Sequence, residues 1–221
     1  KYLINKNNKE ERVMNKLKII ALAICATFIT SIASAEKRIG VSAAYMMFST
    51  DGSETLRQSS NVTNKSVDED VIVPSIFVEV VSDSGFGLGV DYVPVAELGS
   101  GTGDDDDAET SGANKASAEL ASHVTVYALA QADNGVYFKL GMAMADVDTT
   151  ETLATGDTYG NTDTTGIMVA VGRSVDRGSH FIRGDLSYTD YDDVSITSTG
   201  GSVVKADVDS AALTLSIGKS F

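Results

Sequence analysis

Six charged side chains lie within segments that are otherwise apolar or small-residue, and they are the first candidates for chemistry in this sequence. All fall on the less apolar side of segments in which residue character alternates. They are Glu79, Asp91, Glu119, Lys139, Arg183 and Asp185. Two interpretations are open. They could line a selective ion path, or they could neutralise one another in a rigid internal network, because buried charges must be paired.

His123 is the second candidate, since its parity places it on the same face as Glu119 and Tyr127. A catalytic role would need a nucleophile and a carboxylate that orients the imidazole. The sequence contains no nucleophile motif. We therefore expect His123 to be a hydrogen-bonded interior residue of that network, and we do not expect an enzyme. His180 lies beside a predicted turn and is expected to face solvent.

Acidic clusters are the third candidate, because Ca²⁺ and Mg²⁺ prefer oxygen ligands. One cluster comprises Asp190, Asp192 and Asp193. The other is a run of Asp104, Asp105, Asp106 and Asp107. The run lacks the spaced-ligand pattern of a dedicated metal site, so a solvated, charge-repelled loop is the main expectation. We expect no metal and no cofactor.

Composition excludes several classes of protein. The chain has 221 residues, with 17 Lys and Arg against 31 Asp and Glu, for a formal charge of -14. That balance argues against binding to nucleic acid, which needs a basic surface, and against electrostatic docking on anionic lipid. A single cysteine excludes a disulfide scaffold. The length fits one domain.

The N-terminal region predicts export. Residues 14–35 read as a signal peptide, with a cationic start at Lys16 and Lys18 and an apolar stretch over 19–32. The small residues Ala33 and Ala35 mark the cleavage site, with cutting expected after Ala35. We interpret residues 1–13 as a non-native upstream extension and expect the mature domain to span 36–221.

Period-two alternation dominates the rest of the chain. In residues 211–221 the apolar Leu213, Leu215, Ile217 and Phe221 alternate with small and polar residues. The same pattern predicts eight strands, at about 38–49, 70–81, 86–95, 118–131, 136–146, 164–175, 180–191 and 207–221. Tight turns rich in Gly, Asp and Asn are expected at 82–85, 132–135 and 176–179. Long polar loops are expected at 50–69, 96–117, 147–163 and 192–206.

Short and long connections alternate strictly, as they do in transmembrane barrels with short periplasmic turns and long external loops. One strand face is mostly Gly, Ala, Ser and Thr, which suits the narrow lumen of an eight-stranded barrel. The other face is apolar and must meet lipid. Aromatic residues at the strand ends form the expected interfacial girdle. These residues are Tyr45, Phe86, Tyr92, Phe138, Tyr188 and Phe221. The fold class is therefore an all-β, eight-stranded, antiparallel, up-and-down transmembrane β-barrel.

This pattern resembles the small outer-membrane barrel families of Gram-negative bacteria, namely opacity-protein-like and OmpX-like proteins and the OmpA membrane domain. The resemblance covers 36–221, and its most specific element is the final strand. It implies that Leu213, Leu215, Ile217 and Phe221 form the signal for the barrel-assembly machinery. Lys219 departs from the usual apolar residue, although a lysine at the rim can extend to the interface.

The resemblance implies an outer-membrane location, with lipid and lipopolysaccharide as partners, and it favours a monomer. The expected function is structural or interactive, through envelope integrity and adhesion or recognition by the loops. The main alternative is a small porin-like channel for ions or small solutes. A soluble secreted ligand-binding barrel is a further alternative. In a weaker hypothesis, divalent ions bridge the loop carboxylates to lipopolysaccharide phosphates. We expect no nucleic-acid partner.

Overall fold

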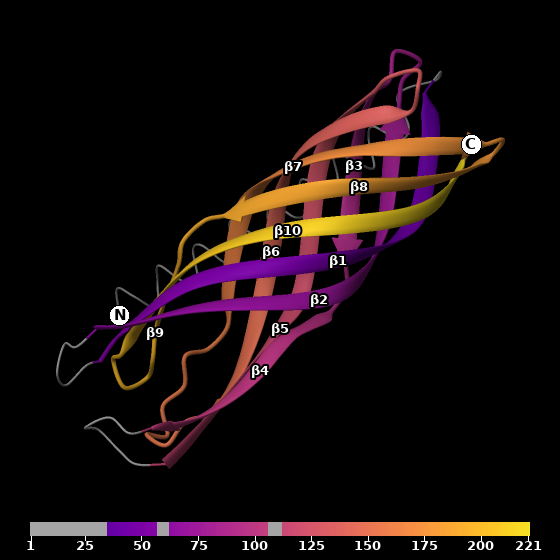
Figure 1. Ribbon diagram of the computed structural model, residues 1–221. Coiled ribbons are helices and arrows are strands. Elements are labelled where there is room, and N and C mark those ends of the chain that lie inside the picture. Colours follow the sequence, from indigo (N-terminus) through magenta and orange to yellow (C-terminus); the bar gives the residue numbers. More distant parts are fainter. Residues whose placement is uncertain (1–34, 57–61, 106–111) are drawn as a thin grey trace.

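The computed structural model describes residues 35–56, 62–105 and 112–221. Within them, ten strands form one antiparallel sheet that closes on itself (Figure 1). The strands are β1 (Glu36–Thr55), β2 (Val62–Val81), β3 (Phe86–Val93), β4 (Ala96–Asp105), β5 (Gly112–Gln131), β6 (Val136–Thr152), β7 (Thr162–Arg177), β8 (His180–Tyr191), β9 (Val194–Thr197) and β10 (Val203–Ser220).

Eight strands of the described residues make the barrel wall. Their order around the ring is β1-β2-β3-β5-β6-β7-β8-β10, and β1 pairs with β10 to close it. The closing register is continuous from Arg38 opposite Ser220 to Thr55 opposite Val203. Strand β4 pairs only with β5, and β9 only with β10. The predicted eight-stranded antiparallel barrel is confirmed.

The short turns lie at one end of the barrel, which we call the turn end. Gly85 and Gly135 close two of them with φ of 81° and 83°, a conformation that other L-residues rarely adopt. Strands β7 and β8 are joined through Gly178 and Ser179. The start of β1 lies at the same end, because the backbone of Lys37 exchanges hydrogen bonds with that of Phe221. The opposite end, which carries the long connections, is the loop end.

The long connections differ from the prediction of polar loops. Most of their residues lie in strands, partly as the separate strands β4 and β9 and partly as extensions of the barrel strands. Strands β1 and β2, for example, remain paired from Glu36 opposite Val81 to Thr55 opposite Val62. Thr and Val are frequent in these extensions and favour strands. Their polar character therefore marks exposure to water and not an end to backbone pairing.

Strand β3 ends at Val93, two residues before the predicted boundary, and β4 lies within a predicted loop. The last β2–β3 pair joins Ile76 and Tyr92. The two prolines of the chain, Pro74 and Pro94, lie beside this point. Proline lacks the backbone donor that a sheet ladder requires, which is consistent with pairing that stops here.

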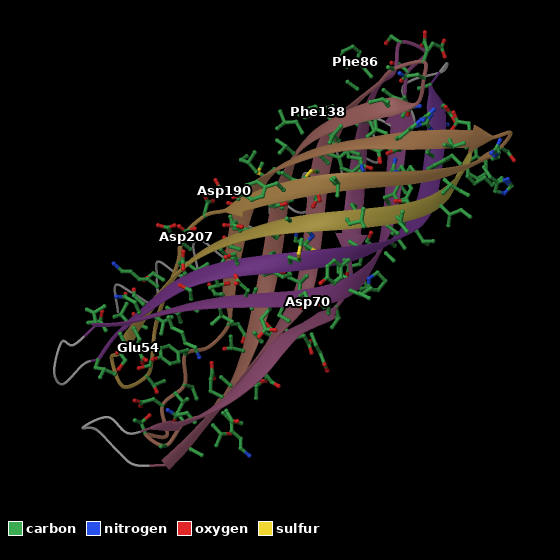
Figure 2. The ribbon with its side chains drawn as sticks, viewed as in Figure 1. Glu54, Asp70, Phe86, Phe138, Asp190 and Asp207 are labelled. Carbon is green, nitrogen blue, oxygen red and sulfur yellow. The ribbon has the colours of Figure 1, made fainter. Side chains whose placement is uncertain are left out.

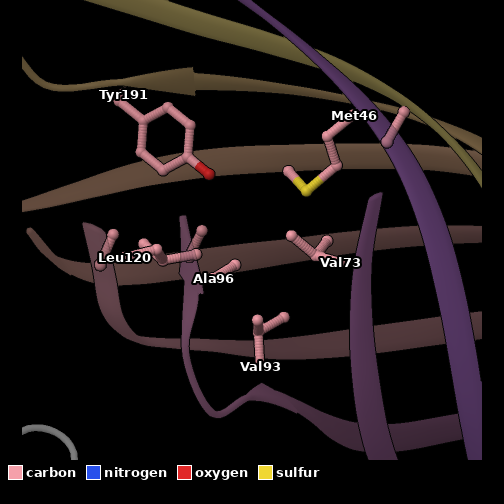
Figure 3. Packing of buried hydrophobic residues seen from close by; sticks show 9 residues of the cluster. Met46, Val73, Val93, Ala96, Leu120 and Tyr191 are labelled. Atoms are coloured by element: carbon pink, nitrogen blue, oxygen red, sulfur yellow. The ribbon is translucent and has the colours of Figure 1, made fainter. Parts of the chain in front are cut away.

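The inner and outer faces differ as the alternation predicts. Large apolar side chains such as Ile39, Leu140 and Leu215 are exposed on the outer face. Inside, Met46, Val73, Leu120 and Tyr191 belong to an apolar cluster that gathers residues from β1, β2, β5 and β8 (Figure 3). No helix in the described residues is long and apolar enough to cross a membrane.

Candidate functional site

Glu79 of β2 is the centre of a charged layer that crosses the lumen in the turn-end half. Its side chain has no solvent exposure. Arg183 of β8 donates from Nη1 to both carboxylate oxygens, at 2.8 and 2.9 Å. The Tyr127 hydroxyl donates to Oε2 at 2.8 Å, and Arg38 lies 3.4 Å from Oε1. One carboxylate thus joins β1, β2, β5 and β8.

A second buried pair lies beside the first. Lys139 Nζ of β6 is 3.2 Å from Asp185 Oδ2 of β8, and the Tyr137 hydroxyl donates to the same oxygen at 2.5 Å. Asp91 of β3 accepts a hydrogen bond from Ser75 Oγ at 2.9 Å. Both pairs combine charge neutralisation with further hydrogen bonds, which buried ions need to offset the loss of hydration.

Aromatic rings fill the space around these charges. The Arg183 guanidinium lies 4.0 Å from the centre of the Phe77 ring, and Phe77 in turn packs against Phe181 at 6.1 Å between centroids. Lys139 lies 4.9 Å from the ring of Tyr127 and 5.2 Å from that of Tyr137. Such cation–π contacts gain strength when they are removed from water. Charges and rings together form one layer, which we call the lumen plug.

Each plug ring faces a glycine directly across the sheet. Gly40 is the register partner of Phe77, Gly218 of Phe181, Gly89 of Tyr127 and Gly172 of Tyr137. A Cβ on any of these glycines would lie 2.3 to 2.6 Å from the ring it faces. The inward glycines therefore make room for the rings. Each ring of the lumen plug is placed opposite a residue that has no side chain.

A cavity of about 90 Å³ lies beside the lumen plug. Asp91, Lys139, Arg183 and Asp185 provide its charged lining, and Met46, Val73 and Val93 of the apolar cluster also contribute to it. The volume corresponds to about three water molecules.

The structure brings together most of the charges expected in the lumen network. Glu79, Lys139, Arg183 and Asp185 meet in the plug, and Asp91 lines the cavity next to it. The expectation for Glu119 is wrong. Glu119 is exposed at the loop end, opposite Glu97 and Asp148, because the β5–β6 register shifts between Leu120 and Ser122 and changes the inward parity.

His123 lies inside, as its parity predicts, but it does not join the charged network. Its Nε2 is 3.1 Å from the Tyr191 hydroxyl, and it lines the cavity. In the described residues no group of three or more His, Cys, Asp or Glu could hold a metal ion. Asp106, Asp107 and Ala33 lie outside these residues, Asp104 and Asp105 end β4, and Ala35 directly precedes β1.

Several plug residues were missed by sequence reasoning, although a signal for them exists. Arg38, Phe77, Tyr137 and Phe181 each share the parity of an inward charge or small residue on the same strand. Counting aromatic and basic residues on the small-residue face would have found them. Tyr127 is the exception, since its parity already places it beside His123 on the inward face.

The outer face carries the remaining predicted residues. All six girdle aromatics are exposed, with Phe86, Phe138 and Phe221 near the turn end and Tyr45, Tyr92 and Tyr188 further along their strands. Leu213, Leu215 and Ile217, predicted with Phe221 to form the assembly signal, are also exposed on this face.

This architecture defines the class of protein: a small β-barrel of the outer-membrane type, with an apolar exterior and a filled lumen. No protein-family model and no curated protein matches the sequence. The fold is shared with OprG of Pseudomonas aeruginosa, an outer membrane protein, at 12% identity and a TM-score of 0.58, over 85% of this chain and 96% of OprG.

Two further solved structures are similar at lower scores. Ail, the attachment invasion locus protein of Yersinia pestis, is 12% identical with a TM-score of 0.49, over 85% of this chain and 99% of Ail. The outer membrane protease OmpT of Escherichia coli is 8% identical with a TM-score of 0.44, over 87% of this chain and 100% of OmpT. At such identities the likeness concerns the fold, and a fold does not fix a function.

Replacement of Glu79 should be strongly destabilising. In Glu79→Gln the guanidinium groups of Arg183 and Arg38 lose their buried carboxylate, a change that costs about 3–5 kcal/mol in comparable buried pairs. Urea unfolding in lipid vesicles measures the free-energy difference. Glu97→Gln, on an exposed carboxylate, should change it by less than about 0.5 kcal/mol. Equal effects of the two substitutions would contradict the central role of Glu79.

A methyl group at Gly40 should disturb the plug. Its Cβ would lie 2.3 Å from the Phe77 ring and 2.6 Å from a backbone oxygen, so Gly40→Ala should cost about 1–3 kcal/mol. Gly52→Ala on the same strand meets its nearest atom at 3.4 Å and should be tolerated. The same urea titration compares the two variants, and equal stability would argue against ring–glycine packing.

Proposed function

We propose that the protein is a non-enzymatic, non-conducting outer-membrane barrel of a Gram-negative bacterium, which anchors an acidic β-structured surface outside the cell. The lumen plug is the observation that carries this proposal. Its charges are bonded to one another across the lumen, and its rings occupy the space between them. An eight-stranded barrel has little room beyond such a layer.

The outer surface supports the second half of the proposal. Carboxylates including Asp70, Asp190 and Asp207 lie towards the loop end, whereas Phe86 and Phe138 lie at the turn end (Figure 2). Because β1, β2, β5, β6 and β10 continue as paired strands to the loop end, they would hold these carboxylates on a rigid frame outside the membrane. Adhesion or recognition through this surface, together with a contribution to envelope integrity, is the role we propose.

A small porin is the alternative, and the cavity beside the plug is the feature that favours it. Its difficulty is the plug itself, which an ion would have to disrupt. A soluble ligand-binding barrel is less consistent with the molecule, since it would place the apolar face inside. Ile39, Leu140, Leu186 and Leu215 are instead among many large apolar side chains exposed on the outside.

Planar-bilayer recording tests the closed lumen. The purified protein should give no conductance steps, and Phe77→Ala/Phe181→Ala should produce them, because it removes two rings from the plug. Phe86→Ala/Phe138→Ala removes two exposed rings from the outer face and should remain silent. A heat-dependent shift in gel migration would establish that each variant is folded. Stable steps from the unaltered protein would overturn the proposal in favour of the porin.

Attachment of living cells tests the surface role. Asp207→Asn/Asp209→Asn removes two loop-end carboxylates and should reduce binding of cells to a surface coated with a cationic polymer. Asp83→Asn/Asp133→Asn removes two carboxylates from turns at the other end and should leave binding unchanged. Each variant is compared at equal amounts in the outer membrane. If neither pair changes attachment, the loop-end carboxylates do not mediate it.

A further inference from the structure

The basic residues of the described chain fall into three separate groups. Arg38, Lys139 and Arg183 are buried in the lumen plug. Lys65, Lys115 and Lys205 are exposed in the loop-end half. The other four Lys and Arg side chains all lie at the turn end on the outer face. They are Lys37, Arg173, Arg177 and Lys219.

These four residues and His180 lie at the turn end of the adjacent strands β1, β10, β8 and β7, and we call this group the basic rim. In the register, Lys219 of β10 lies opposite Ile39 of β1 on one side and His180 of β8 on the other. His180 in turn lies opposite Arg177 of β7. Lys37 is joined through its backbone to Phe221.

The basic rim lacks neutralising partners among the described residues. Lys37, Arg173, Arg177 and Lys219 make no ion pair with them. Two carboxylates adjacent in sequence to rim residues have other partners, since Glu36 accepts from Arg38 and Asp176 accepts from Ser174. In a chain with a formal charge of -14, a strip of unpaired cations on the outer face is a distinct local feature.

The opposite end of the same strands is acidic. Asp190 follows His180 by ten residues along β8, and Asp209 precedes Lys219 by ten residues along β10. At about 3.4 Å per residue and a strand tilt of about 40°, ten residues rise about 25 Å, which is the height of the apolar band on a membrane barrel. In a barrel that spans a membrane, Lys219 and His180 would therefore lie at one interface and these carboxylates at the other.

An apolar groove adjoins the basic rim. Phe86, Ala130, Val136, Phe138 and Val171 line it on the outer face of β3, β5, β6 and β7. Arg173 borders the groove, because it is the direct register partner of Val136. The small Ala130 lies between the two phenylalanines, as it pairs with Phe86 on one side and Phe138 on the other. A groove of this kind fits a hydrocarbon chain, with a cation at its polar end.

We propose that the basic rim and the adjoining groove bind anionic phospholipids of the periplasmic leaflet. Arg173, Lys219 and Lys37 contact the phosphate groups, and the groove beside Arg173 holds an acyl chain. Lys219 lies 4.8 Å from the centre of the Phe221 ring, a contact that keeps the ammonium group near the interface. The acidic loop end repels anionic lipid, so the selectivity is confined to one leaflet. This inference rests on the outer-membrane orientation proposed above.

Native mass spectrometry of the full-length exported protein, released from vesicles of equal parts phosphatidylglycerol and phosphatidylcholine, tests this lipid preference. The unaltered protein should retain phosphatidylglycerol about fivefold over phosphatidylcholine, the ratio that corresponds to ~1 kcal/mol for one cation near an anionic surface. Lys37→Gln/Arg173→Gln/Lys219→Gln should lose the preference. Lys65→Gln/Lys115→Gln/Lys205→Gln removes the same charge from the loop end and should keep it.

Two further arms separate the alternatives. Inorganic phosphate added in excess should not displace the lipid, and displacement would show a site for the phosphate group alone. Equal retention of the two lipids by the unaltered protein, or an equal loss in both triple variants, would overturn the proposal. A heat-dependent gel shift and extraction by detergent only, measured on the same samples, report on membrane residence. Absence of the gel shift, together with extraction without detergent, would contradict the proposed function whatever the lipid selectivity.

Discussion

The carboxylate of Glu79 is the point on which the interior of this barrel depends. An ionised carboxylate without water is tolerated only when cations and hydrogen-bond donors surround it. Arg183, Arg38 and Tyr127 supply these from three different strands. Their rings and alkyl stems then need space, which the inward glycines provide. Burial of one charge therefore sets the choice of residue at many positions around the ring.

Much of the fold follows from alternation alone. A period of two fixes which side chains point inward, so Lys139, Arg183 and Asp185 could be placed in the lumen without knowledge of their neighbours. The order of short and long connections fixed the up-and-down topology. Which inward charges pair with one another depends on barrel stagger, because residues that meet across the lumen come from strands that are not adjacent.

Glu119 illustrates the limit of this reasoning. Its parity was counted from a strand assumed to be regular, but the pairing with β6 shifts between Leu120 and Ser122. One extra residue reverses every inward and outward assignment beyond it. No glycine or proline in the sequence indicates this shift, because the residues there are Leu120, Ala121 and Ser122. The polar composition of the loop end led to a second wrong expectation. Residues predicted to form loops are exposed to water there and still pair as strands.

Closure of the ring by β1 and β10 has a kinetic consequence. The two strands that complete the wall are the first and last of the barrel, so their contacts span almost its whole sequence. Contacts of such long range form slowly, since the loop entropy must be lost before they contribute. Before β10 pairs with β1, one edge of β1 has unpaired backbone groups, and Arg38 has no neighbouring strand on that side. The polypeptide therefore reaches its native state only after synthesis of the final strand, and it needs protection from aggregation until then.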